Sequence, residues 1–286
     1  MTLRVGVTLP QFRHEAEPAV AAAVAAEATG LDGVFVFDHM WPLGQPDRPA
    51  LHSLVLLGAL AAETSSVTVG PLVSRVGILP NAVLVHALAS LHRMVGSRLL
   101  VTLGTGDERN RPENEAYGLG FPPVAERVAA LVDCCRRLRA EGVATWIGGR
   151  SRAVLRAVSE ADGWNRWGAD APTFASETAE LREAVAIARG PAGEAGGAGD
   201  APAVSWGGQV LLGRTQEEAD EKLARFGPRP GLVHGTIADL AAHLAALSDA
   251  GASWAVCAPL DVGADPRAVE YVAEAANLVS DDAARR

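Results

Sequence analysis

The sequence has 286 residues, of which 49% are apolar and 21% charged, a composition typical of a globular protein. Its 34 acidic residues outnumber its 25 basic ones, and the net charge of −9 disfavours nucleic acid and anionic membranes as partners, because both require a positive protein surface. Three cysteines without a CxxC pair indicate neither a disulfide framework nor a structural zinc site, and favour a reducing compartment.

The first residues contain no apolar core of a signal peptide. Charged residues also interrupt every apolar run before it reaches the ~20 residues that a membrane helix needs. We therefore expect a cytoplasmic protein without a membrane partner.

Short β-rich apolar runs alternate with longer segments of helical period along the whole chain. The predicted strand and helix of each unit are, in chain order, Leu3–Leu9 and Glu17–Thr29, Val34–Phe37 and Pro49–Glu63, Val67–Val73 and Asn81–Met94, Leu99–Leu103 and Val124–Arg139, Thr145–Ile147 and Ser151–Ala161, Trp164–Trp167 and Thr173–Arg189, Ala203–Leu212 and Thr215–Phe226, and Trp254–Ala258 and Pro266–Leu278. An additional helix is predicted at Ile237–Ala250, inside the last connection.

Eight such units predict an α/β fold in which one domain, residues 1–286, forms a closed (β/α)₈ TIM barrel. Runs such as VFVF and LLVTL are apolar on both faces, which is typical of parallel strands covered by helices. The alternative is an open doubly wound sheet with GxGxxG in its first βα turn, but that turn reads LPQFRHE. The Gly/Ala-rich segment 189–203 is predicted to be a flexible loop on the face opposite the active site.

In a barrel of this kind the functional groups stand where the strands end at their carboxyl side. His39 follows the second strand and could hold or transfer a proton near neutral pH. Asp107 follows the fourth strand and could orient that imidazole, or act as an acid if its pKa were raised. The alternative is that Asp38 caps the following turn and His39 makes only structural hydrogen bonds.

Gly148 and Gly149 end the fifth strand directly before a helix. Glycines at a helix N-terminus let an anion approach backbone N–H groups, so this pair is a candidate phosphate cradle, and a tight βα turn is its alternative. The sequence has no HxH at the end of the first strand and no HExxH, so no metal site is predicted.

Several runs together resemble the luciferase-like monooxygenase superfamily, and within it the branch that uses the deazaflavin coenzyme F420. They are GVTLPQ, AAEATGLDGVFVFDHMW, VTVGPLVSRVGILPNAVLVHALASLHRMVGSRLLVTLGTGD, ENEAYGL, WIGG, ADGWN and HGTIADLAAHLAALSDAGASWAVCAPL. The resemblance covers nearly the whole chain and implies a bacterial-luciferase-like barrel, here with shortened insertions at AEGVAT and GPRPGLVHG.

The resemblance also implies roles for individual residues. His39 matches the histidine beside the reactive ring of the cofactor, and Asp107 matches the acidic residue of the GTG[DE] element. The remaining expected site residues are Asp38, Leu72, Val73, Thr105, Gly106, Gly148 and Gly149 for the cofactor, with a cis peptide at Leu72–Val73 and the phosphate at the two glycines, and Gln11, Phe12, Trp41 and Trp167 for the substrate pocket. A homodimer paired through the second and third helices is expected as well.

The first functional hypothesis is therefore an F420-dependent oxidoreductase that moves a hydride between the deazaflavin and a small organic substrate. An FMN-dependent monooxygenase that activates oxygen is the alternative with the same fold. A non-catalytic cofactor-binding barrel is the alternative of a different class, since the fold alone does not establish catalysis.

Overall fold

A computed structural model of the chain describes residues 2–189 and 201–285. The central part of the predicted flexible segment 189–203 therefore lies outside the described residues. The strands are β1 (Arg4–Thr8), β2 (Gly33–Val36), β3 (Thr68–Arg75), β4 (Leu100–Gly104), β5 (Ala144–Gly148), β6 (Gly163–Trp167), β7 (Ala203–Gly213), β8 (Val233–Thr236) and β9 (Trp254–Pro259). The helices are α1 (Glu17–Ala28), α2 (Ser53–Glu63), α3 (Asn81–Val95), α4 (Arg111–Ala116), α5 (Val124–Ala140), α6 (Arg152–Ala157), α7 (Ala171–Arg189), α8 (Gln216–Phe226), α9 (Ile237–Asp249) and α10 (Arg267–Arg285).

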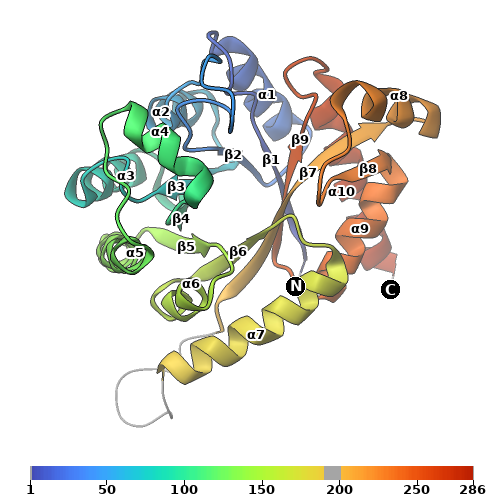
Figure 1. Cartoon of the computed structure of the whole chain (residues 1–286). Coiled ribbons are helices and arrows are strands. Elements are labelled where there is room, and N and C mark those ends of the chain that lie inside the picture. The colour runs from blue at the N-terminus through green and yellow to red at the C-terminus, as the bar shows by residue number, and fades with distance from the viewer. Residues whose placement is uncertain (1, 190–200, 286) are drawn as a thin grey trace.

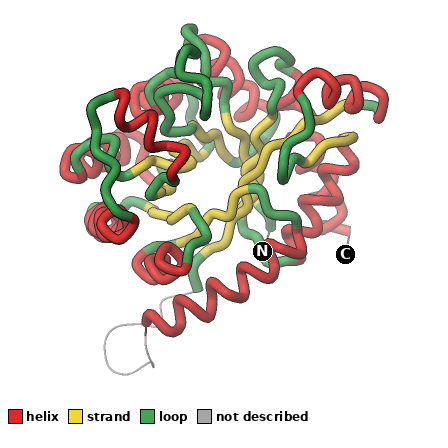
Figure 2. Tube along the Cα trace, in the orientation of Figure 1, coloured by secondary structure: helices red, strands yellow, loops and turns green. Residues whose placement is uncertain are grey.

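Eight parallel strands close into a barrel, with the helices on the outside (Figures 1 and 2). The order around the barrel is β1, β2, β3, β4, β5, β6, β7 and β9, and β9 pairs with β1 again. The barrel closes where β6 pairs with β7, with Gly163 beside Ala203 and Trp167 beside Gly207. The predicted (β/α)₈ TIM barrel is confirmed.

Two elements were not predicted from the sequence. Strand β8 pairs with the outer part of β7, where Val210 lies beside Val233. Its four residues, VHGT, contain one apolar side chain and so give no strand pattern, and β7 offers a partner because it extends beyond its pairing with β6. Helix α4 reads RPENEA and is almost entirely polar, so no helical period can be detected in it.

Large aromatic side chains fill the interior of the barrel. Trp254 makes edge contacts with Phe35 and Trp146, with ring centroids 5.7 and 6.3 Å apart. The interior cluster consists of Phe35, Leu72, Leu100, Trp146, Trp254 and Val256. Glycines make room for these rings, since a Cβ at Gly33 would lie 3.0 Å from Phe35 and Trp254, and one at Gly163 only 2.5 Å from Trp146. The packed interior leaves the carboxyl ends of the strands as the place for a site.

The outer helices are held by a larger buried layer of mostly Ala, Leu and Val side chains between them and the strands. The connection from α5 to β5 is short, as expected, since α5 ends at Ala140 and β5 begins at Ala144. Within residues 2–189 and 201–285, no helix combines the length and the hydropathy that spanning a bilayer requires.

Candidate functional site

Asp38 fixes the loop that leaves β2. Its carboxylate accepts hydrogen bonds from Ser53 Oγ at 2.7 Å, from Ser74 Oγ at 3.3 Å and from the backbone N–H of Arg75 at 2.8 Å. The Arg75 side chain donates from Nε to the Asp38 carbonyl oxygen at 2.9 Å. Asp38 is buried, and these contacts tie the exit of β2 to α2 and β3. The position of His39 is thereby set, whereas a contact of Asp38 with a cofactor stays a prediction.

His39 is held by Glu113, a residue of α4 that the sequence did not single out. Nδ1 of His39 lies 3.1 Å from Oε2 of Glu113, and the other carboxylate oxygen accepts a hydrogen bond from the backbone N–H of Met40. Arg75 Nη2 lies 2.7 Å from Oε2 of Glu113. The side chains of Glu113 and Arg75 are 1% and 5% exposed, and that of His39 is 18% exposed. With Nδ1–H donated to Glu113, Nε2 of neutral His39 is the acceptor that remains.

The charges of this cluster balance one another. Burial alone would raise the pKa of Glu113, but the hydrogen bond with His39, the charge of Arg75 and the N–H of Met40 bring it below its ordinary value. Burial lowers the pKa of Arg75, and the charges of Glu113 and Asp38 oppose that effect. A guanidinium stays protonated in proteins. Glu113 is therefore an ionised carboxylate behind His39, neutralised by Arg75.

Asp107 stands in a different setting at the exit of β4. Its carboxylate starts the 3₁₀ turn Glu108–Asn110 by accepting the backbone N–H of Arg109 at 2.9 Å, and it pairs with Arg109 Nη2 at 2.9 Å. Its side chain is 54% exposed. Partial burial alone would raise the pKa of Asp107, but the hydrogen bonds and charge of Arg109, and the charge of His39, lower it. Asp107 is thus an ionised group near His39, without the raised pKa that an acid role requires.

The peptide Leu72–Val73 in β3 is cis, as the resemblance implied. The Val73 side chain lies between β4 and β5, because a Cβ at Gly104 would be 2.5 Å from one Val73 methyl group and a Cβ at Gly148 2.6 Å from the other. Such approaches are too close for a real side chain. Gly148 therefore has a packing reason to be glycine, in addition to any role toward a phosphate.

The sequence left two interpretations for Gly148 and Gly149 in the turn after β5, a phosphate cradle and a tight βα turn. Gly149 has a φ of +124°, which favours glycine, and its N–H points to the Asn165 carbonyl at 3.4 Å. Ser151 caps α6 by accepting the N–H of Val154 at 3.3 Å. The geometry is that of a tight βα turn, and phosphate binding at Gly148 and Gly149 stays a prediction. Directly after β4, Thr105 and Gly106 are half-buried at the mouth.

Among the residues predicted for the substrate pocket, Gln11 makes hydrogen bonds to the backbone, and the other three are aromatic. Gln11 is fully buried, and its amide nitrogen donates to the carbonyl oxygens of Phe37 at 2.7 Å and of Leu51 at 3.3 Å. Gln11 thus joins the exits of β1 and β2, and its contact with a substrate stays a prediction. Phe12 stacks on Phe37 with centroids 5.9 Å apart, and Phe37 meets Trp167 edge-on at 5.7 Å.

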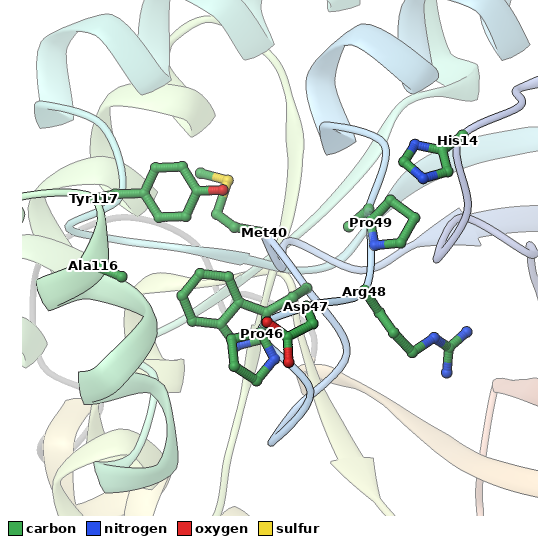
Figure 3. A pocket seen from close by; sticks show the side chains of 10 residues that line it. His14, Met40, Pro46, Asp47, Arg48, Pro49, Ala116 and Tyr117 are labelled. Atoms are coloured by element: carbon green, nitrogen blue, oxygen red, sulfur yellow. The ribbon is translucent and has the colours of Figure 1, made fainter.

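Trp41 lines a pocket of about 500 Å³, which we call the Trp41 pocket (Figure 3). The residues around it are His14, Met40, Trp41, Pro46, Asp47, Arg48, Pro49, Ala50, Ala116 and Tyr117. A second pocket of about 460 Å³ lies between the loop after β3 and the segment between α4 and α5. Arg75, Thr105, Asn114, Phe121 and Arg127 are among the residues that line it.

Arg75, Glu113, Phe37 and Arg127 were missed by the sequence analysis. Arg75 ends the apolar strand β3, and a charged residue that is buried at such a position needs a partner, but only the structure shows that Arg75 is buried. Glu113 opens the ENEAYGL run that contributed to the resemblance, but its partner His39 is 74 residues away in the chain. No local pattern reports such a pair.

Comparison with known proteins gives a consistent picture. The luciferase-like monooxygenase family matches residues 3–148. An F420-dependent glucose-6-phosphate dehydrogenase from Kineococcus radiotolerans is 36% identical over 118 residues, 41% of this chain and 34% of that protein. The chain thus aligns with about a third of the length of that curated relative.

Two solved structures share the whole fold. An F420-dependent secondary alcohol dehydrogenase in complex with an F420-acetone adduct has a TM-score of 0.79 at 14% identity, covering 98% of this chain and 99% of that one. The oxygenating constituent of 3,6-diketocamphane monooxygenase from Pseudomonas putida, in complex with FMN, has a TM-score of 0.74 at 12% identity, with 98% of each chain covered. The family match extends over half of the chain and includes Asp38, His39 and Asp107, so the chain belongs to the luciferase-like monooxygenase family.

Proposed function

We propose that this protein is an oxidoreductase that transfers a hydride between coenzyme F420 and a small organic substrate. The observation that carries the proposal is His39 at the barrel mouth, held through Nδ1 by the buried and ionised Glu113. The relatives named as F420-dependent glucose-6-phosphate dehydrogenases support the choice of coenzyme.

The residues present fit an anionic coenzyme. Arg127 is 8% exposed, its Nε lacks a hydrogen-bond partner among the described residues, and its guanidinium stacks on Phe121 at 3.9 Å. A buried cation without a carboxylate partner favours a bound anion. Arg127 lines the second pocket together with Thr105, which directly follows β4 and is expected to line the ring. When bound, the deazaflavin supplies the centre that accepts or donates the hydride.

The groups expected to hold the coenzyme come from three neighbouring strands. The Leu72–Val73 peptide of β3 would support the ring, Thr105 and Gly106 after β4 would line its plane, and Gly148 and Gly149 after β5 would receive the phosphate. These strands are consecutive in the barrel, so their exits face one part of the mouth. Asp38 would act indirectly, through the loop that it fixes.

His39 is the proposed proton carrier. Its Nδ1 is engaged by Glu113, so Nε2 is the atom that would take the proton of an alcohol, or return it to a carbonyl oxygen. Glu113 fixes the tautomer and stabilises the protonated ring, because a carboxylate favours a nearby positive charge. Asp107, ionised beside Arg109, would contribute charge near the ring and not a proton.

The proposal is tested by titrating the purified protein with F420 and with FMN, followed by turnover assays. We expect fluorescence to show tight binding of F420, and His39→Ala to bind it within a few-fold while lowering turnover by about 10²–10⁴. The control is His234→Ala, an exposed histidine of β8, which should leave both quantities unchanged. Preference for FMN with oxygen consumption would favour the monooxygenase, and cofactor binding without turnover a non-catalytic barrel.

We also propose that the protein is a cytoplasmic homodimer paired through α2 and α3. Support comes from apolar side chains exposed on these helices, namely Val55 at 75%, Val83 at 51% and Met94 at 70%. The free thiols of Cys134, Cys135 and Cys257 are in keeping with a reducing compartment. Light scattering at micromolar concentration should give the mass of a dimer, and a monomer mass would contradict this pairing.

A further inference from the structure

The second pocket contains a buried cation without a counter-charge. Arg127, near the start of α5, lines this pocket, and its guanidinium lies 3.9 Å from the centre of the Phe121 ring. Its Nε is buried without a hydrogen-bond partner, and within residues 2–189 and 201–285 its guanidinium forms no ion pair. A charge taken out of water is destabilising unless an opposite charge or hydrogen bonds replace the lost hydration. A bound anion would supply both.

Arg75, which also lines the pocket, is already engaged. Its Nε donates to the carbonyl oxygen of Asp38 at 2.9 Å, and its Nη1 donates to the side-chain oxygen of Asn114 at 3.3 Å. Its Nη2 lies 2.7 Å from the carboxylate of Glu113. Arg75 is therefore a counter-ion for the protein itself, and Arg127 is the guanidinium that a ligand can use.

Arg111 provides an internal comparison. It stacks on the same Phe121 ring, with its guanidinium 4.8 Å from the ring centre. Unlike Arg127, it pairs with a carboxylate, that of Glu108, at 2.9 Å, and its side chain is 44% exposed. Arg111 is not among the residues that line the pocket. Stacking on the ring is thus common to both arginines, whereas burial in the pocket without a partner is specific to Arg127.

The charges around Arg127 favour a single carboxylate over a phosphate. A phosphate ester carries about two negative charges near neutral pH and needs several charge-assisted donors. The pocket offers one unengaged guanidinium, and Glu126, an exposed residue of its lining, adds a negative charge that would repel a second one. A guanidinium binds a carboxylate through two parallel hydrogen bonds. One carboxylate is therefore enough to neutralise Arg127.

The other walls of the pocket are mostly apolar. Val76 and Ile78, in the loop after β3, are buried. Leu119 and Phe121, on the segment between α4 and α5, are half-buried. A volume of about 460 Å³ is within the range of pockets that take small organic molecules. The pocket thus combines one cation with an apolar surface, which suits an organic acid better than an inorganic anion.

Asn114 holds one wall of the pocket in place. Its backbone carbonyl accepts the N–H of Leu119 at 2.8 Å, and its Nδ2 donates to the carbonyl oxygen of Gly120 at 3.1 Å. Since its Oδ1 accepts from Arg75, the segment after α4 is tied to the end of β3. The pocket is therefore formed before a ligand binds, which reduces the ordering that binding requires.

We propose that the second pocket binds a small organic acid, with the carboxylate on Arg127 and the apolar body against Phe121 and the loop after β3. The carboxylate comes either from a separate small molecule or from the anionic coenzyme of the proposed function, and both sources present the same chemistry to Arg127. The site itself does not depend on the proposed hydride transfer.

The chemistry is tested by calorimetric titration of the coenzyme-free protein with phenylacetate and with phenylacetamide, its uncharged counterpart. We expect phenylacetate to bind at least about tenfold more tightly than phenylacetamide and than inorganic phosphate, because only the acid combines a carboxylate with an apolar body. Equal binding of the acid and the amide, tighter binding of inorganic phosphate, or no binding of phenylacetate at millimolar concentration would overturn the proposal.

Two arginine variants locate the site. Arg127→Met keeps an apolar side chain but removes the charge, and should weaken phenylacetate binding at least about tenfold. Arg111→Met removes the paired arginine from the same ring, and as the matched control it should leave binding unchanged. Equal losses in the two variants would assign the effect to stacking on Phe121 and contradict a site at Arg127.

Thermal unfolding gives a second readout. Without ligand, Arg127→Met should unfold at no lower temperature than the parent protein, because the charge that it removes is buried without a partner. Phenylacetate should raise the unfolding temperature of the parent and of Arg111→Met, but not that of Arg127→Met. Equal stabilisation of Arg127→Met and the parent would refute the assignment.

The source of the carboxylate is distinguished by repeating the phenylacetate titration with F420 bound. Undiminished binding assigns the site to a separate organic acid. Loss of binding that is restored when F420 is replaced by its chromophore without the anionic side chain assigns it to a carboxylate of the coenzyme. Loss with both would place the ring itself in the pocket and overturn the proposal. Failure of F420 to bind would contradict the proposed function and leave the titration of the coenzyme-free protein valid.

Discussion

Two ionised carboxylates act on His39, and they differ in burial and in whether they touch the imidazole. Glu113 is 1% exposed, touches the imidazole at 3.1 Å and is neutralised by the buried Arg75. Asp107 is 54% exposed and pairs with Arg109, two residues along the same turn. Asp107 lies in a recognisable motif, whereas Glu113 lies in a short helix without a detectable pattern. A motif therefore identified the region of the site, while burial and long-range contact identified the carboxylate that holds the histidine.

The largest expected effect concerns the arginines of the two carboxylates. Arg75→Met leaves Glu113 buried without its counter-ion, so the free energy of unfolding should fall by about 3–5 kcal/mol. Arg109→Met removes an exposed pair and should change it by less than about 0.5 kcal/mol. Urea unfolding of both variants measures the contrast. Equal losses would show that the burial difference between the two carboxylates has no energetic consequence.

A smaller effect is expected on turnover when each carboxylate becomes an amide. Glu113→Gln should lower kcat at least tenfold, about 1.4 kcal/mol, because an amide stabilises a protonated imidazole less than a carboxylate does. Asp107→Asn should cost only a few-fold. The pH profile of kcat/KM should shift more for Glu113→Gln than for Asp107→Asn, because Glu113 both touches His39 and carries a charge beside it. A purely structural role would not produce this shift.

The matched control for this comparison is Glu115→Gln, an exposed residue of the same helix α4. It should retain wild-type turnover per folded molecule, as measured by activity normalised to circular dichroism. If Asp107→Asn loses more turnover than Glu113→Gln, then Asp107 is the more important of the two carboxylates.

The smallest effect concerns acid stability. Both pKa values lie below the ordinary ones in the folded state, so each carboxylate contributes stability that is present above the unfolded value and lost as the pH falls through the folded one. This stability is lost at pH values below 4.5 for Glu113 and below 3.8 for Asp107, which are the ordinary pKa values of the two groups. When the pH falls from about 7 to about 3, the unfolding free energy should decrease less in Glu113→Gln than in Asp107→Asn. Identical curves for the two variants in urea unfolding would contradict this ranking.

Much of the site region followed from the sequence, because parallel strands of a barrel all end at the same face. The positions of His39 after β2 and of Thr105 to Asp107 after β4 were anticipated in this way. The cis peptide at Leu72–Val73 was expected only from the resemblance to the luciferase-like family. Gly148 shows what the sequence alone does not reveal. The sequence suggested an anion cradle, and the structure adds the Val73 methyl groups that exclude any side chain there.

By itself, the sequence determined the class of fold and the face of the barrel that carries the site, since hydrophobic periodicity and the order of strands and helices are local properties of the chain. Only the tertiary structure decided that β8 pairs with the outer part of β7 and that buried Gln11 donates a hydrogen bond to the Phe37 carbonyl. It also decided that Glu113 contacts His39, which is 74 residues away in the chain. The physical reason is that burial and long-range hydrogen bonding depend on which distant segments meet, and a buried charge is tolerated only where its partner arrives from elsewhere in the chain.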